Sequence, residues 1–240
     1  MGYPFIPTGY HGGAQTAVSR IVIHATVSPC KPGGARNIAE YFRSPGAGGS
    51  AHYVIDPGEI VQCVKENVVA YHAPPNTGSI GIELCDPQAG PGSRWVDSGH
   101  EAMLVRAAAL VREVAARWNV PLVKLGPKDL LAGKRGICGH IDVSNAWHKT
   151  DHGDPEEHGP FPWDHFMALI QETEMTPKET FDAVWNTDAI PSPGKDPKNP
   201  TWAPSSYLTD IDGKVRQLQT KVDSLSADIA AIKAAVVPKA

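Results

Sequence analysis

The sequence has few cysteines, and no two of them are close together. The four cysteines among the 240 residues are Cys30, Cys63, Cys85 and Cys138, and none forms a CxxC pair. A disulfide framework in a small secreted domain would need more cysteines at more regular spacing. We therefore expect reduced, partly buried thiols, with Cys138 as a core residue rather than a metal ligand.

Long apolar runs and an excess of basic charge are also absent. No apolar run approaches the ~20 residues of a membrane span, and the first residues lack the basic start and apolar stretch of an export signal. The formal net charge is -4, which gives little electrostatic support for binding nucleic acid. We expect no membrane span, no export signal and no nucleic-acid partner.

The composition that is present is that of a globular protein with an appendage. Hydrophobic residues make up 41% and charged residues 20% of the chain, enough for one well-buried domain plus a tail. Three regions differ in pattern. These patterns predict a folded domain over residues 1–174, a linker rich in proline and polar residues over residues 175–208, and a helix over residues 209–238.

The first region predicts an α/β fold. Short β-branched runs between turn residues predict strands at Arg20–Thr26, Ser50–Asp56, Glu59–Val64, Ser79–Cys85 and Gly136–Ile141. Apolar residues three and four apart predict a helix over His100–Trp118, with shorter helices at Asn37–Phe42 and from Pro162 to Ile170. The fold class is therefore a mixed central β-sheet flanked by helices.

The last region carries a heptad pattern. Spacings of four and three residues alternate through Ile211, Val215, Leu218, Val222, Leu225, Ile229, Ile232 and Val236. Mostly β-branched residues at one core position favour a parallel coiled coil, which would make the protein a homodimer or higher oligomer through residues 211–236. The alternative is a single amphipathic helix that docks on the domain or frays in solution.

Two histidines stand at the ends of predicted strands. His24 ends a β-branched run, and His140 ends a second apolar segment that precedes a loop rich in Asp and His. A hydrolytic zinc ion needs three protein ligands and an open position for water, and strand ends hold ligands firmly. The pattern indicates a zinc site, for which the rest of the chain must supply a third ligand, a base and a substrate groove.

Further motifs accompany these histidines in a fixed order. They are Ile23-His-Ala-Thr26, Ser50-Ala-His-Tyr-Val-Ile-Asp56, Ala70-Tyr-His-Ala73, Ser79-Ile-Gly-Ile-Glu-Leu84, Gly139-His-Ile-Asp-Val-Ser144 and Phe161-Pro-Trp163. Through them, residues 19 to about 167 resemble the zinc-dependent N-acetylmuramoyl-L-alanine amidases of the type 2 family, which share their fold with phage T7 lysozyme and the peptidoglycan recognition proteins. The resemblance implies one Zn²⁺ ion and cleavage of bacterial peptidoglycan between N-acetylmuramic acid and L-alanine.

Within that family the chain looks most like a phage endolysin. Such an enzyme would stay in the host cytoplasm until a holin opens its route to the cell wall. Several proteins of this fold bind peptidoglycan without cleaving it, so a non-catalytic peptidoglycan-binding module is the alternative function.

The resemblance makes His24 and His140 zinc ligands, but it leaves two candidates for the third. Spacing from His140 favours Asp151. Turn chemistry favours Asp154, because the proline that follows it restricts its backbone and helps to aim its carboxylate. We expect Asp154 to bind the metal, with Asp151 as the alternative.

The resemblance also suggests the catalytic residues. Glu83 stands where the family has its general base, and strand alternation directs it to the face opposite Ile82 and Leu84. The T7-type enzymes use a tyrosine at a position that here is Ala51, so the base must be Glu83.

The resemblance also suggests an oxyanion-stabilising residue and a substrate-binding residue. In the family, a lysine two residues before the third ligand stabilises the oxyanion; here this residue is His152 if Asp154 binds zinc, and Lys149 if Asp151 does. His72 lies in a motif that lines the family's substrate groove and is expected to bind substrate. His52 is expected to be a hydrogen-bonded structural histidine.

Overall fold

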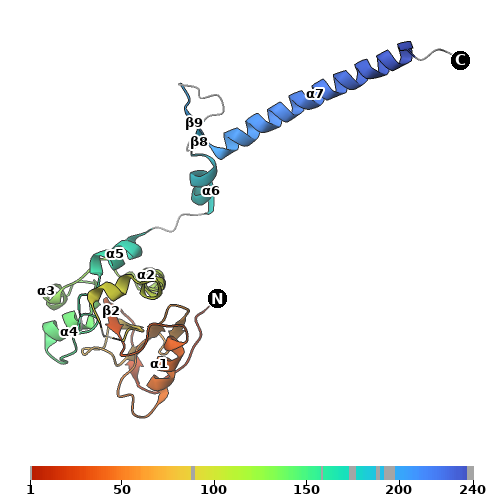
Figure 1. The fold of residues 1–240 in the computed structure, drawn as a ribbon. Helices are drawn as coiled ribbons and strands as arrows, with labels where there is room; N and C mark the ends of the chain where they lie inside the picture. The colour runs from red at the N-terminus through yellow and green to blue at the C-terminus, as the bar shows by residue number, and fades with distance from the viewer. Residues whose placement is uncertain are drawn as a thin grey trace. The chain divides into compact units, whose positions relative to one another are not determined.

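The chain divides into two compact units, Met1–Glu172 and Thr173–Ala240 (Figure 1). This computed structural model describes residues 2–87, 90–157, 159–172, 177–187, 190–191 and 198–236. The first unit contains the central sheet, and the second contains one long helix.

The first unit is built around a five-stranded mixed sheet, which confirms the predicted fold class. Its strand order is β4 (Ile60–Gln62), β3 (Tyr53–Ile55), β6 (Ser79–Leu84), β2 (Arg20–Ala25) and β7 (Gly136–Gly139). Strands β3, β6, β2 and β7 are parallel, and β4 pairs with β3 in the antiparallel sense. Every residue of β2 is buried, as expected for a central parallel strand covered on both faces.

The two faces of the sheet carry separate apolar clusters. Ile21 and Ile23 of β2 belong to the main core, together with residues of helices α1 (Gly34–Arg43), α2 (Ser98–Trp118) and α5 (Trp163–Gln171). Val22 belongs to a smaller cluster with residues of α3 (Pro127–Leu131) and α4 (His140–Trp147). Because strand residues alternate between faces, His24 lies on the same face as Val22, next to α4.

Helix α2 begins two residues before its predicted start at His100. The side chain of Asp97 accepts hydrogen bonds from the backbone N–H groups of Gly99 and His100, at 2.9 Å each, and so caps the helix. The helix ends where Asn119 adopts a left-handed conformation, with φ of 53°.

The structure corrects the end of the last predicted strand. Strand β7 stops at Gly139, and His140 is the first residue of α4 instead of the last residue of a strand. Asp142, at the third position of this helix, accepts a hydrogen bond from the Gly139 N–H at 2.8 Å, which stabilises the helix start. The predicted strand Ser50–Asp56 is shortened to β3.

Four elements of the first unit carry no clear sequence signal. Two of them, β1 (His11–Ala14) and β5 (Val68–Ala70), form a separate antiparallel pair. The 3-10 helix η1 (Gly92–Val96) and helix α3 are the other two. Each is five residues or shorter, so none offers a full period of apolar residues.

The second unit contains α6 (Pro177–Trp185), β8 (Ile190–Pro191), β9 (Thr201–Trp202) and α7 (Pro204–Val236). The segment predicted as a linker thus includes short elements, and α7 begins at Pro204 rather than at residue 209. Proline suits a helix start because its fixed φ is helical and its missing N–H would have no partner there. The predicted domain boundary at residues 174–175 and the predicted helix end at residue 238 lie outside the described residues.

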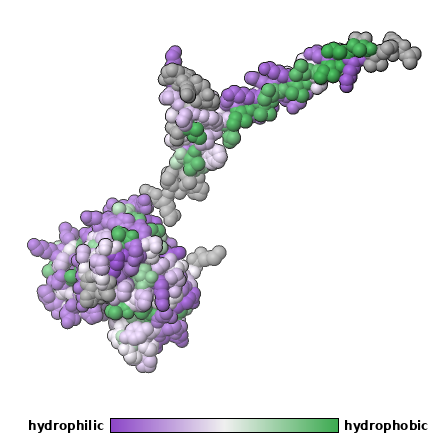
Figure 2. All heavy atoms as spheres, viewed as in Figure 1, coloured by the Kyte–Doolittle hydropathy of each residue, from purple (hydrophilic) through white to green (hydrophobic). Residues whose placement is uncertain are grey.

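An apolar stripe runs along α7 (Figure 2). The eight heptad side chains, from Ile211 to Val236, are between 50% and 73% exposed. None of the helices that the structure describes is both long enough and apolar enough to cross a membrane.

Candidate active site

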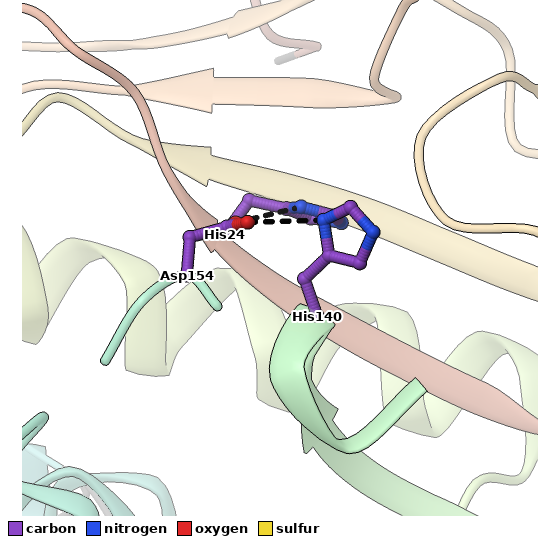
Figure 3. A group of neighbouring side chains, drawn as sticks. All are labelled: His24, His140 and Asp154. Carbon is purple, nitrogen blue, oxygen red and sulfur yellow. Dashed lines mark hydrogen bonds and ion pairs between the residues drawn. The ribbon is translucent and has the colours of Figure 1, made fainter. Parts of the chain in front are cut away.

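Three side chains from separate elements meet on the α4 face of the sheet (Figure 3). They are His24 near the end of β2, His140 at the start of α4, and Asp154 in the loop after α4. The carboxylate of Asp154 lies 3.1 Å from His24 Nδ1 and 3.0 Å from His140 Nδ1. All three residues are buried, and one ligand atom from each lies within 4.8 Å of the others. Two imidazoles and one carboxylate are a donor set that suits a catalytic zinc ion with an open fourth position.

Backbone contacts hold Asp154 in this position. Its carbonyl oxygen accepts a hydrogen bond from the Ile141 N–H at 3.0 Å, and its Oδ2 accepts one from the Ala25 N–H at 3.3 Å. Burial alone would raise the pKa of the Asp154 carboxyl, but the contacts with His140 and His24 outweigh it and hold this pKa well below its usual range. The carboxylate is therefore negatively charged and ready to bind a cation.

Asp151, the alternative third ligand, is exposed and does not reach the two histidines. It lines a surface cavity of about 700 Å³ together with Lys149, His152 and residues of α4. The structure thus brings Asp154, and not Asp151, together with His24 and His140 in the described part of the chain.

The two candidate oxyanion residues, His152 and Lys149, both lie in the loop after α4. The His152 ring stacks on the His140 ring, with centroids 4.9 Å apart, and His152 Nδ1 lies 3.7 Å from Asp154 Oδ1. The His152 side chain is 63% exposed, so it can face a bound substrate. Lys149 is also exposed and lines the adjacent cavity.

Glu83 lies beside His24 because of the strand register. His24 of β2 is the direct partner of Glu83 in the parallel strand β6, so their side chains leave the same face of the sheet. Glu83 Oε1 is 4.0 Å from His24 Nδ1. Burial, and secondarily the charge of Asp154, raise the pKa of Glu83 well above its ordinary value. A carboxylate with a raised pKa can both accept and return a proton.

His72, the predicted substrate-binding residue, lies next to the cluster. It is a buried residue, and its Nδ1 lies 3.0 Å from His24 Nε2, the ring nitrogen of His24 that does not face Asp154. His72 Nε2 lies 2.9 Å from the hydroxyl of Ser79. The structure therefore shows contacts of His72 with a residue of the cluster, and its contact with substrate stays a prediction.

His52 has the surroundings expected of a structural histidine. It is fully buried, its Nδ1 accepts a hydrogen bond from the Gly81 N–H at 3.0 Å, and its Nε2 lies 3.0 Å from the carbonyl oxygen of Val68. Ala51 is also fully buried.

A family model and a curated protein that resemble this chain both carry the same description. The family model described as N-acetylmuramoyl-L-alanine amidase matches residues 14–157. The N-acetylmuramoyl-L-alanine amidase XlyA of Bacillus subtilis (strain 168) is 28% identical over 138 residues, which cover 54% of this chain and 43% of XlyA. The match thus spans less than half the length of that relative.

Solved structures extend the comparison to the fold. The Staphylococcus aureus hydrolase AmiA in complex with its ligand matches with a TM-score of 0.56 at 16% identity, over 76% of this chain and 85% of AmiA. The catalytic domain of XlyA matches with a TM-score of 0.48 at 24% identity, over 69% of this chain and 95% of that domain. The likeness to AmiA shows a shared fold.

Proposed function

Because the chain belongs to the N-acetylmuramoyl-L-alanine amidase family, we propose that it hydrolyses the amide bond between N-acetylmuramic acid and L-alanine in bacterial peptidoglycan. The observation that carries this proposal is the pairing of His24 with Glu83 in adjacent parallel strands. This register places a protonatable carboxylate next to a cluster of two histidines and an aspartate, so that metal ligands and a base reach the same small volume.

The cluster fits one Zn²⁺ ion, which His24 and His140 would hold through the ring nitrogens that face Asp154, together with the Asp154 carboxylate. When bound, the ion polarises the scissile carbonyl and makes the attacking water more acidic. The short contacts of Asp154 with both imidazoles support its assignment as the third ligand.

The other residues of the site move protons and hold charge. Glu83 accepts a proton from the water that attacks the carbonyl carbon, and it returns that proton to the leaving amine. Its raised pKa, caused mainly by burial, favours the return. His152, when protonated, stabilises the oxyanion that forms on the carbonyl, with Lys149 as the alternative. The products are the free carboxylate of the muramic acid and the free amino group of the stem peptide.

Digestion of purified cell walls tests this activity. We expect the protein to release stem-peptide amino groups from the walls, and a chelator to abolish the release. The matched variant Glu83→Gln should hold zinc and release little. Binding to walls without any release would favour the non-catalytic peptidoglycan-binding module.

We also propose that two copies of the chain associate through α7. The eight apolar side chains of its stripe lie on one face at heptad spacing and are at least half exposed. A second copy can cover this stripe, since β-branched residues dominate one core position and leucines occupy part of the other, the pattern of a parallel dimer. In this register Asp228 and Lys233 flank the core where they can pair with the opposite charges of the partner.

A dimer would place two catalytic domains on one polymeric substrate and so raise the effective affinity for the wall. To test the association, Leu218→Lys with Leu225→Lys should reduce the solution mass of the full chain from dimer to monomer. The control Thr220→Lys with Ala227→Lys adds the same charges on the opposite side of α7 and should leave the mass unchanged. A monomeric wild-type chain would contradict the proposal.

We propose, finally, that the activity serves host lysis as a phage endolysin that stays in the host cytoplasm until a holin opens the membrane. The support for this role is the amidase family of the first unit together with the Pro-rich segment and the heptad helix that follow it in the sequence. Expression in a bacterium whose walls the protein digests should cause lysis only when a holin is co-expressed. Lysis without a holin would contradict the dependence.

A further inference from the structure

A chain of buried hydrogen bonds leads from His24 away from the cluster that His24 forms with His140 and Asp154. His24 Nε2 contacts His72 Nδ1 at 3.0 Å, and His72 Nε2 contacts the Ser79 hydroxyl at 2.9 Å. The Ser79 hydroxyl in turn donates to the backbone carbonyl of Asn76. His24, His72 and Ser79 are all buried, so water does not compete for these contacts.

The direction of these hydrogen bonds follows from metal binding. If Nδ1 of His24 offers its lone pair to a metal, the proton of the neutral ring must lie on Nε2. That N–H then donates to His72 Nδ1, which leaves the proton of His72 on Nε2 and directs it to Ser79. The same direction follows from the other end of the chain of hydrogen bonds. The carbonyl of Asn76 can only accept, so the Ser79 hydroxyl donates to it and accepts from His72.

The His72 ring itself is held firmly. The side-chain oxygen of Asn76 accepts hydrogen bonds from the backbone N–H groups of His72 and Ala73, at 2.9 and 2.8 Å. The ring also packs directly over Gly81, where a Cβ would lie only 2.5 Å from His72 Cγ. The ring therefore has little room to turn away from His24.

The second imidazole of the cluster has no comparable partner. His140 Nε2 is buried and makes no hydrogen bond within the described part of the chain. Of the two cluster histidines, His24 is thus the one whose second ring nitrogen, Nε2, contacts another side chain in the described part of the chain.

We propose that His72 is a positioning residue that holds His24 in the tautomer and orientation required to bind the metal. This proposal deepens the proposed function, because it rests on the same metal cluster. Partners of this kind, which bind the second nitrogen of a ligating histidine, change metal affinity by about 10- to 100-fold when they are replaced.

The test uses two variants of His72 and one control in the full chain. His72→Phe keeps a ring of similar size but removes the acceptor for His24. His72→Asn keeps an acceptor near the position of Nδ1. The control His100→Phe alters another buried histidine, whose two ring nitrogens contact Asp97 and Asp86 and not His24. Zinc affinity is measured by competition with a chromophoric chelator, and ligand geometry by the visible spectrum of the Co²⁺-substituted protein.

We expect His72→Phe to weaken zinc binding by about 10- to 100-fold and to change the Co²⁺ spectrum. His72→Asn should recover most of the affinity. His100→Phe should unfold at a lower temperature but bind zinc as the wild type does. This set of results separates positioning of His24 from a general loosening of the fold.

Two results would overturn the proposal: wild-type zinc affinity in His72→Phe, or an equal loss of affinity in His100→Phe. Both readouts are independent of peptidoglycan cleavage. If the wild type binds zinc but does not digest walls, the proposed function fails and the role of His72 stands. If the wild type binds no zinc, both fail.

Discussion

Replacement of Asp154 by asparagine should remove most of the zinc affinity. The change keeps the size of the side chain and a carbonyl oxygen, but it removes the negative charge that lies 3.0 to 3.1 Å from both imidazoles. The site would retain two neutral nitrogen ligands and one weak oxygen ligand.

The size of the loss can be worked from the number of ligands. A structural zinc ion with four ligands is bound by about 10–16 kcal/mol, which is roughly 2.5–4 kcal/mol for each ligand. Since about 1.4 kcal/mol corresponds to a factor of ten, the loss of one of the three ligands in this cluster weakens binding by about 10²- to 10³-fold.

Asp151→Asn is the matched control. The same chemical change is made three residues away in the same loop, at an exposed side chain outside the cluster. Zinc content after dialysis, zinc affinity by chelator competition and wall digestion are measured on both variants. We expect Asp151→Asn to match the wild type in all three. Full zinc content in Asp154→Asn together with loss of zinc in Asp151→Asn would refute the assignment and would transfer the oxyanion role from His152 to Lys149.

Three further predictions follow from single contacts. Glu83→Gln should keep zinc and lower the rate of wall digestion by about 10²- to 10⁴-fold, because it removes the base but no ligand; a loss of zinc would mean that Glu83 binds the metal. Burial alone would lower the pKa of His100, but hydrogen bonds to Asp86 and two neighbouring side chains raise it to about 10. The stabilisation of the fold by protonated His100 is then complete below the unfolded pKa of about 6.5 and is lost by about pH 10. The wild type should therefore exceed His100→Gln in free energy of unfolding by less at pH 10 than at pH 7, as measured by urea titration. Gly81→Ala should lower the free energy of unfolding by about 1–3 kcal/mol and weaken zinc binding, since the added Cβ would press on the His72 ring; unchanged thermal unfolding would show that the ring moves freely.

Much of the fold was predictable because it depends on local patterns. The β-branched runs of β2 and β6 are buried on both faces, and such runs are visible in sequence. Helix α2 is long enough to show its apolar period. The start of α4 was missed because the apolar run of β7 leads directly into His140, and the helix is set by one hydrogen bond between Asp142 and Gly139. Strands β1 and β5 were missed because they are short and β1 contains two glycines.

The candidate site was predictable in its residue types and less so in its contacts. Motifs pointed to His24, His140 and Glu83, each of which stands in or next to a central strand. No local pattern predicted that His72 contacts His24, because 48 residues separate them and the contact depends on how the loop after β5 folds over Gly81. The sequence signal that could have suggested it is the absence of a side chain at Gly81, two residues before Glu83 in the same strand face.

By itself, the sequence determined which chemical groups this protein has, where most strands of the five-stranded sheet and the long helices form, and that α7 carries an apolar stripe. These features follow from local order along the chain, which fixes side-chain alternation and helical spacing. Only the tertiary structure decided which groups meet. The register of β2 against β6 places Glu83 beside His24, and one hydrogen bond from Ile141 to the backbone of Asp154 brings that aspartate, instead of the exposed Asp151, to the two imidazoles. Both decisions depend on residues far apart in sequence, whose distance is set by packing and backbone hydrogen bonds across the fold.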